Sequence, residues 1–169
     1  MVKKDAEFPP FAIRHRGIFS YAKLLKCVHT WCEENDYEFH EIKVKYKIPS
    51  PAGAEVEGDL IGERNITDYL KYKLTMTYHI WDMRDVEIVE DGQKKKVQEG
   101  TVVIEVRAEY TLDYAERFKG KFLEELQKFY HKFIIKRVID DWYEDNLLIK
   151  MMDLNETIKR TLQYEEYRG

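Results

Sequence analysis

The fold is decided by the stretch from residue 70 to residue 80, which reads LKYKLTMTYHI. Each even-numbered residue in it is apolar or aromatic, and lysine, threonine and histidine fill the odd positions. Successive side chains on a β-strand point to opposite faces, so this alternation predicts one buried face and one wet face. The same parity continues at Ile42, Val44, Tyr46, Ile48, Val56, Leu60, Val86, Ile88, Val102, Ile104, Val106, Ala108, Tyr110 and Leu112. We therefore expect one sheet whose buried face carries even-numbered residues.

Turn signals divide this pattern into strands. The four expected strands cover residues 41–48, 54–64, 67–90 and 94–113. Asp91-Gly92 predicts a tight hairpin turn between the last two strands. The parity of the apolar residues slips in the returning strand, so we expect a bulge at Glu99-Gly100.

Helices are expected before and after the strands. Residues 18–35 predict an amphipathic helix, and a long helix with an apolar stripe follows the last strand. A short last helix is expected near Asp153, where Glu156 would complete a capping box. Gly58 and Gly62 predict bulges or bends in the second strand. The predicted class is α+β, a curved four-stranded antiparallel meander with the helices packed on one face.

The domain organisation follows from this order. Residues 1–17 are expected to be a flexible N-terminal arm, because Pro9-Pro10 forbids a helix there. Residues 18–169 then form a single α+β domain. The outer part of the long hairpin, around residues 83–99, is expected to project beyond the sheet.

Composition limits the class of partner. The 169 residues include 28 lysines and arginines against 32 aspartates and glutamates, for a net charge of −4. This balance disfavours nucleic acid as the main partner. Only four glutamines and four asparagines accompany these charges, a skew typical of heat-adapted proteins. No apolar run approaches the roughly 20 residues that span a bilayer, and no signal-peptide pattern is present. Two cysteines, Cys27 and Cys32, predict a cytoplasmic protein without disulfides.

The wet face is predicted to change charge from strand to strand, with lysines on the first strand and acidic residues on the second. Such cross-strand pairs help to set strand register. Tyr69, His79 and Trp81 break the pattern, and we take them as a candidate partner-binding patch. The alternative is that the N-terminal arm or the last helix covers them.

The expected hairpin tip ends in three lysines, which are further candidate partner-binding residues. The residues are Lys94, Lys95 and Lys96. They suit a solvated tip, and they would also suit a finger that contacts phosphate on RNA or lipid.

No motif for catalysis, cofactor binding or metal binding appears in the sequence. It contains no Gly-rich phosphate loop, no G-x-S-x-G, no H-E-x-x-H and no C-x-x-C. Cys27 and His29 point about 200° apart on a helix, so they cannot converge on one metal ion. A cysteine nucleophile with a histidine that is adjacent to it in space remains an open alternative, although buried helical cysteines usually serve packing. We expect no enzyme and no cofactor.

Four tyrosines on the even-numbered face are candidates to line a ligand cavity. They are Tyr46, Tyr72, Tyr78 and Tyr110. A curved sheet wrapped around a helix, as in helix-grip or START-like domains, would direct their hydroxyls into a pocket. The alternative, which we favour, is that they are core residues whose hydroxyls reach the edge of the sheet.

Several short segments together give the chain its only family likeness. They are residues 24–26, 37–41, 62–64, 68–69, 91–92 and 112–114. In these the chain resembles small uncharacterised archaeal α+β proteins of unassigned function. The resemblance implies an archaeal, cytoplasmic setting and carries over no active site.

Three functions are compatible with these features. The first is a non-enzymatic interaction or scaffold protein that binds a macromolecular partner or itself. The second is a helix-grip domain that binds a hydrophobic small molecule, and the third is an RNA- or ribosome-associated factor. We favour the first, because no catalytic constellation is present and because the hairpin and the odd-numbered aromatics offer contact surfaces.

Overall fold

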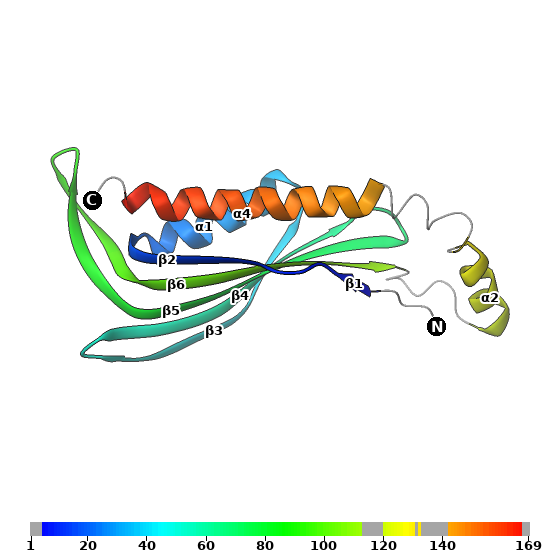
Figure 1. The fold of residues 1–169 in the computed structure, drawn as a ribbon, viewed down its shortest axis with the longest axis horizontal. Coiled ribbons are helices and arrows are strands. Elements are labelled where there is room, and N and C mark those ends of the chain that lie inside the picture. The colour runs from blue at the N-terminus through cyan, green and yellow to red at the C-terminus, as the bar shows by residue number, and fades with distance from the viewer. Residues whose placement is uncertain (1–4, 113–119, 131, 133–141, 167–169) are drawn as a thin grey trace.

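The computed structural model describes residues 5–112, 120–130, 132 and 142–166. It is an α+β protein in which helices α1 and α4 lie along one face of a bent antiparallel sheet (Figure 1). The elements are β1 (Asp5–Glu7), β2 (Phe11–Phe19), α1 (Tyr21–Glu34), β3 (Glu38–Ser50), β4 (Gly53–Asn65), β5 (Leu70–Glu90), β6 (Gln93–Leu112), α2 (Lys121–Tyr130) and α4 (Glu144–Glu166). The predicted α+β class is confirmed.

The sheet has six strands in the order β1-β6-β5-β4-β3, with β2 also paired to β6. All of these pairs are antiparallel. The expected four-stranded meander is present as β3 to β6. The two added strands lie beside β6, so β3 forms the opposite edge of the sheet.

The N-terminal segment is a pair of strands, and the expectation of an arm over residues 1–17 is wrong for its described part. The β2–β6 ladder runs from Phe11, opposite Val106, to Phe19, opposite Gln98. Phe19 is fully buried in the core. The open edge of β6 and the burial of Phe19 together order this segment, and neither is visible in local sequence.

The long hairpin turns at Asp91-Gly92, as predicted. Both residues have positive φ, 50° and 77°, the backbone of a type I′ turn. A register shift interrupts the β5–β6 ladder between Trp81 and Arg84. The extra residue therefore lies on β5, and the expectation of a bulge on β6 is wrong. Gly100 lies opposite, where a Cβ would be 2.8 Å from the carbonyl oxygen of Trp81.

The two glycines of β4 make room for side chains. The sequence predicted bulges or bends here, and no register shift occurs at Gly58 or Gly62, so there is no bulge at either glycine. A Cβ on Gly58 would overlap the ring of Tyr78, and one on Gly62 would lie 3.0 Å from the sulfur of Cys32. Glycine at these positions lets the core approach the backbone of β4.

Even-numbered residues of β4, of β5 up to Ile80 and of β6 from Val102 form the buried core, as the alternation predicts. Val86 and Ile88, which lie past the register shift in β5, are only half-buried. The buried members are Val56, Leu60, Leu70, Tyr72, Leu74, Met76, Tyr78, Ile80, Val102, Ile104, Val106, Ala108, Tyr110 and Leu112. The helices complete the core with Leu24, Val28, Trp31, Cys32, Leu147, Met151, Leu154, Ile158 and Leu162. This packing fixes which sheet face the helices cover, and so leaves the odd-numbered face wet.

Strand β3 departs from the pattern, because its even-numbered apolar residues are exposed. Ile42 is 63% exposed, Val44 49% and Tyr46 60%. Near the start of the strand, Phe39 packs against the core, and its ring contacts His29 on α1. The later part of β3 lies away from the helices (Figure 1). The expectation that Ile42, Val44 and Tyr46 are core residues is therefore wrong, because no helix of the described residues reaches them. The side chain of Ile48, the fourth expected position, lies outside the described part of the structure.

The helices differ from the expected order. α4 is the long helix, with 23 residues, and it begins at Glu144. Asp153 and Glu156 lie inside it, so the expected capping box is wrong. The buried stripe from Leu147 to Leu162 continues across Asp153, which explains why the helix does not restart there.

The other two helices are shorter than expected. α1 begins at Tyr21 after the N-cap Ser20, because the residues before it belong to β2. α2 has ten residues and lies beyond one end of the sheet (Figure 1). Residues 131 and 133–141, which the expected long helix would include, lie outside the described residues. No helix of the described chain is long and apolar enough to cross a membrane.

Candidate functional site

The outer edge of β3 is the first candidate surface. No other described strand pairs with this edge, so alternate backbone N–H and C=O groups along it are left without a strand partner. Val44 and Tyr46 are exposed on one face of the strand, opposite Gly58 and Val56 of β4, and the exposed Ile42 precedes them at the register shift between Glu41 and Lys43. These three residues form the apolar row. Unpaired edge backbone beside exposed apolar side chains can accept a further strand.

The opposite face of β3 carries a row of lysines. Lys43, Lys45 and Lys47 lie opposite Asp59, Glu57 and Glu55 of β4. The Lys47 ammonium is 3.1 Å from Oε1 of Glu55. Lys43 and Lys45 form no ion pair with any described residue. Within the described part of the chain, two positive charges on this edge are therefore left without a partner.

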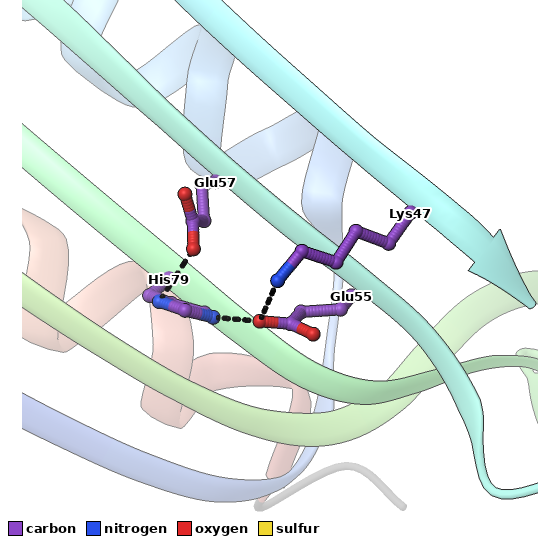
Figure 2. A network of polar contacts seen from close by, with 4 residues as sticks. All are labelled: Lys47, Glu55, Glu57 and His79. Carbon is purple, nitrogen blue, oxygen red and sulfur yellow. Dashed lines mark hydrogen bonds and ion pairs between the residues drawn. The ribbon is translucent and has the colours of Figure 1, made fainter.

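A polar cluster, formed by Lys47, Glu55, Glu57 and His79, joins β3, β4 and β5 on the wet face (Figure 2). Nε2 of His79 lies 2.7 Å from Oε1 of Glu55, and Nδ1 lies 3.3 Å from Oε1 of Glu57. Each ring nitrogen of His79 therefore faces a carboxylate of β4, and the Lys47 ammonium brings a positive charge to Glu55.

The positive and hydrogen-bonding neighbours in the cluster lower the pKa of Glu55. Hydrogen bonds from Lys47 and then His79 hold the pKa of this carboxyl below its usual value of 4.5. Opposite charges nearby favour the ionised form of a carboxylate. Glu55 therefore stays charged and ties the last part of β3 to β5.

The cluster also contains donor atoms of the kind that bind metal ions. One ligand atom each from Glu55, Glu57 and His79 lies within 4.8 Å of the others. The two nitrogens of His79 face different carboxylates, and the Lys47 ammonium already contacts Glu55. A metal ion would have to displace one of these contacts and lie near the Lys47 ammonium. The geometry is therefore that of a network of ion pairs and hydrogen bonds within the protein.

Two of the predicted aromatic patch residues come together. The rings of His79 and Trp81 stack with centroids 3.7 Å apart and planes 15° from parallel. Trp81 is 37% exposed. Tyr69 instead packs against the core, so it does not join this patch.

The lysines of the hairpin tip have acidic neighbours. The Lys95 ammonium lies 3.1 Å from Glu90, and that of Lys96 lies 3.2 Å from Asp85. Lys94 is exposed opposite Val89. The tip therefore presents less free positive charge than its three lysines suggest.

Three of the four candidate cavity tyrosines have hydroxyls bonded to protein groups. Tyr72 donates to the carbonyl oxygen of Tyr143 at 2.6 Å. Tyr110 donates to Glu144 at 2.5 Å, and the Tyr78 hydroxyl lies 2.9 Å from that of Tyr21. These three are core residues, whereas Tyr46 lies exposed on β3.

The two cysteines have little thiolate character. Burial raises the pKa of Cys32 to about 11, and burial also raises the pKa of Cys27. Thiolate, the reactive form, is therefore scarce near neutral pH. The thiols suit packing against the core more than nucleophilic chemistry.

Comparisons with known proteins give no family. No family model and no curated protein matches this chain. The chain is weakly similar to the solved structure of an uncharacterised protein from Rhizobium leguminosarum, with 9% identity, coverage of 95% of this chain and 99% of that chain, and a TM-score of 0.24. A likeness at this TM-score carries no argument about fold or function. The expected likeness to archaeal proteins has no support in these comparisons.

Sequence reasoning found His79 and Trp81 but missed the two features beside them. The contact of His79 with both glutamates depends on the register of β4 against β5, which pairs Glu57 with His79. The free edge of β3 had a sequence signal, since lysines at alternate positions are typical of edge strands. The apolar residues between them masked that signal by suggesting a strand buried on one face.

Proposed function

We propose that this protein is a non-enzymatic interaction protein that receives an extended segment of a protein partner along the outer edge of β3. The observation that carries the proposal is the apolar row of Ile42, Val44 and Tyr46, exposed beside an edge that no described strand occupies. Strand addition uses backbone hydrogen bonds for affinity and alternate side chains for specificity. Both components are present on β3.

The edge is also held in place for such a role. The cluster of Lys47, Glu55, Glu57 and His79 ties β3 to β4 and β5 on the face opposite the apolar row. A strand that is already ordered loses less conformational entropy when a partner pairs with it. The fixed position of β3 therefore supports binding of a partner strand to a preformed edge.

The other two functions have weaker support. In the ligand-binding alternative the tyrosine hydroxyls would contact a small molecule, but those of Tyr72, Tyr78 and Tyr110 contact protein groups. In the RNA-binding alternative the hairpin tip would supply free charge, but Lys95 and Lys96 have acidic neighbours. The cytoplasmic setting remains part of the proposal, supported by two free cysteines.

The test is a selection of extended peptides against the intact protein. A phage-displayed library of random ten-residue peptides is selected for binding, and the selected peptides are then measured against Val44→Glu and Val89→Glu. The second variant is the matched control, because Val89 is also an exposed strand valine, 68% exposed, but lies near the hairpin tip. We expect binding to be lost with Val44→Glu and kept with Val89→Glu.

Amide hydrogen exchange provides the second readout. A bound strand should slow exchange of the outward-facing amides of β3, because they gain hydrogen bonds. If no selected peptide depends on Val44, or if none slows exchange in β3, the proposal is wrong.

A further inference from the structure

The wet face of the sheet follows a rule of alternating charge. Lys71 of β5 lies 2.6 Å from Glu63 of β4, and Lys73 of β5 lies 3.0 Å from Glu109 of β6. Each basic strand therefore lies beside an acidic one. Because β3 is basic on this face, a strand added outside it would meet lysines.

The residue pattern of β4, which pairs with β3, indicates which pattern suits a strand on the other edge of β3. On the wet face β4 presents Glu55, Glu57 and Asp59 to the lysines of β3, and on the other face it presents Val56 and Leu60 to the core. The outer edge of β3 offers the same two faces. The segment that fits there alternates acidic and apolar residues in the same way.

Lys43 and Lys45 can favour an acidic partner strand because they form no ion pair with the described residues. They form none although they lie opposite Asp59 and Glu57. Glu57 is instead 3.3 Å from His79. Carboxylates on an added strand would therefore find lysines that are not already neutralised.

The same lysines argue against a second copy of this chain as the occupant. Antiparallel pairing of two β3 edges would place Lys43, Lys45 and Lys47 of one copy beside those of the other. Like charges directly opposite one another destabilise strand pairing. Lysines on edge strands commonly serve to prevent such self-pairing, but that role alone does not explain the exposed apolar row on the other face.

We infer that the partner segment is an extended strand that alternates acidic with apolar residues, its carboxylates beside Lys43 and Lys45 and its apolar side chains beside Val44 and Tyr46. This inference rests on the proposed function, since it names the partner of the same edge.

The experiment uses three ten-residue peptides that share alternate valine and tyrosine residues. Glutamate, threonine or lysine fills the remaining positions, and each peptide carries a fluorescent label for anisotropy. We expect the glutamate peptide to bind about tenfold more tightly than the lysine peptide, from two or three cross-strand pairs. We expect slower amide exchange along β3 in its complex.

Charge reversal supplies the decisive variant. In Lys43→Glu/Lys45→Glu the preference should invert in favour of the lysine peptide. The matched control is Lys26→Glu/Lys94→Glu, which changes the net charge equally at two exposed lysines away from this edge and should keep the original preference. Circular dichroism and thermal unfolding check that both variants fold.

The outcomes separate this inference from the proposed function. Equal binding of all three peptides with protection of β3 would overturn the acidic preference and leave the edge function standing. No binding by any peptide, or binding without protection of β3, would overturn both. A dimer in sedimentation velocity that Val44→Glu dissociates and Val89→Glu does not would overturn the inference in favour of a second copy.

Discussion

The indole N–H of Trp31 on α1 donates a hydrogen bond to Oδ2 of Asp153 on α4, with 2.7 Å between the heavy atoms. Trp31 is 3% exposed and belongs to the core. The carboxylate therefore joins the two helices above the sheet, in place of the helix-capping role that the sequence predicted. Hydrogen bonds to charged groups contribute more than those between neutral groups.

Asp153→Ala should lower the free energy of unfolding by about 1.5–3 kcal/mol, because the indole N–H loses a charged acceptor. Urea unfolding followed by tryptophan fluorescence measures this change. Glu156→Ala is the control, since Glu156 lies on the same helix and, among the described residues, forms an ion pair only with Lys159, at 3.4 Å. That change should cost at most about 0.5 kcal/mol. Similar losses in both variants would instead favour the capping box.

Phe19→Ala should lower the free energy of unfolding by about 3–5 kcal/mol, the cost of removing a large buried ring. Phe19 is fully buried on β2, in the segment next to the expected arm. The matched control is Phe122→Ala on α2, because Phe122 is 80% exposed and its loss should change stability by at most about 0.5 kcal/mol. A neutral effect of Phe19→Ala would contradict the burial of this ring in the core.

The lowered pKa of Glu55 makes part of the stability depend on pH. A carboxyl whose folded-state pKa lies below its unfolded value stabilises the fold above that unfolded value, here 4.5, and the contribution is lost as the pH falls through the folded pKa. We expect wild type to be more stable than Glu55→Gln at about pH 6. The difference should disappear at about pH 2.

Unfolding by urea at several pH values measures this dependence. Glu87→Gln is the control, because Glu87 is exposed on β5 and forms no ion pair with the described residues. A difference between wild type and Glu55→Gln that stays constant with pH would show that the carboxylate's charge is not what stabilises the cluster.

The thiols should react slowly while the protein is folded. With a pKa of about 11, the thiolate fraction of Cys32 at pH 8 is only about one in a thousand. Ellman's reagent at pH 8 should therefore label both cysteines quickly in guanidinium chloride and slowly in the native state. A Cys27→Ser variant retains only Cys32. Fast labelling of this folded variant by Ellman's reagent would contradict the burial of the Cys32 thiol.

The sequence alone determined the middle of the molecule. Alternation between Leu70 and Ile80 predicts β5, and Asp91-Gly92 predicts the turn into β6. These features are local, because strand parity and turn backbone depend on residues that are adjacent in the chain. The opposite-charge pairs of the wet face were predictable for the same reason, once consecutive strands were taken as neighbours.

Only the tertiary structure decided the edges and the helix layer. Residues 11–19 become a strand because β6 offers them an edge that is distant in the chain: Ile13, for example, pairs with Ile104, 91 residues later. Local sequence shows only the two prolines before them. Asp153 likewise lies within a helix because Trp31 and the buried stripe of α4 meet it in space.

The candidate site divides in the same way. The sequence already contained its lysines, its glutamates and the pair of His79 and Trp81. The register of β4 against β5 brought Glu57 to His79, and the reach of the helices decided that Val44 is exposed while Val56 is buried. Alternation in the sequence predicts that a strand has an apolar face. Whether that face is buried depends on which other segments cover it, and this is a property of the whole fold.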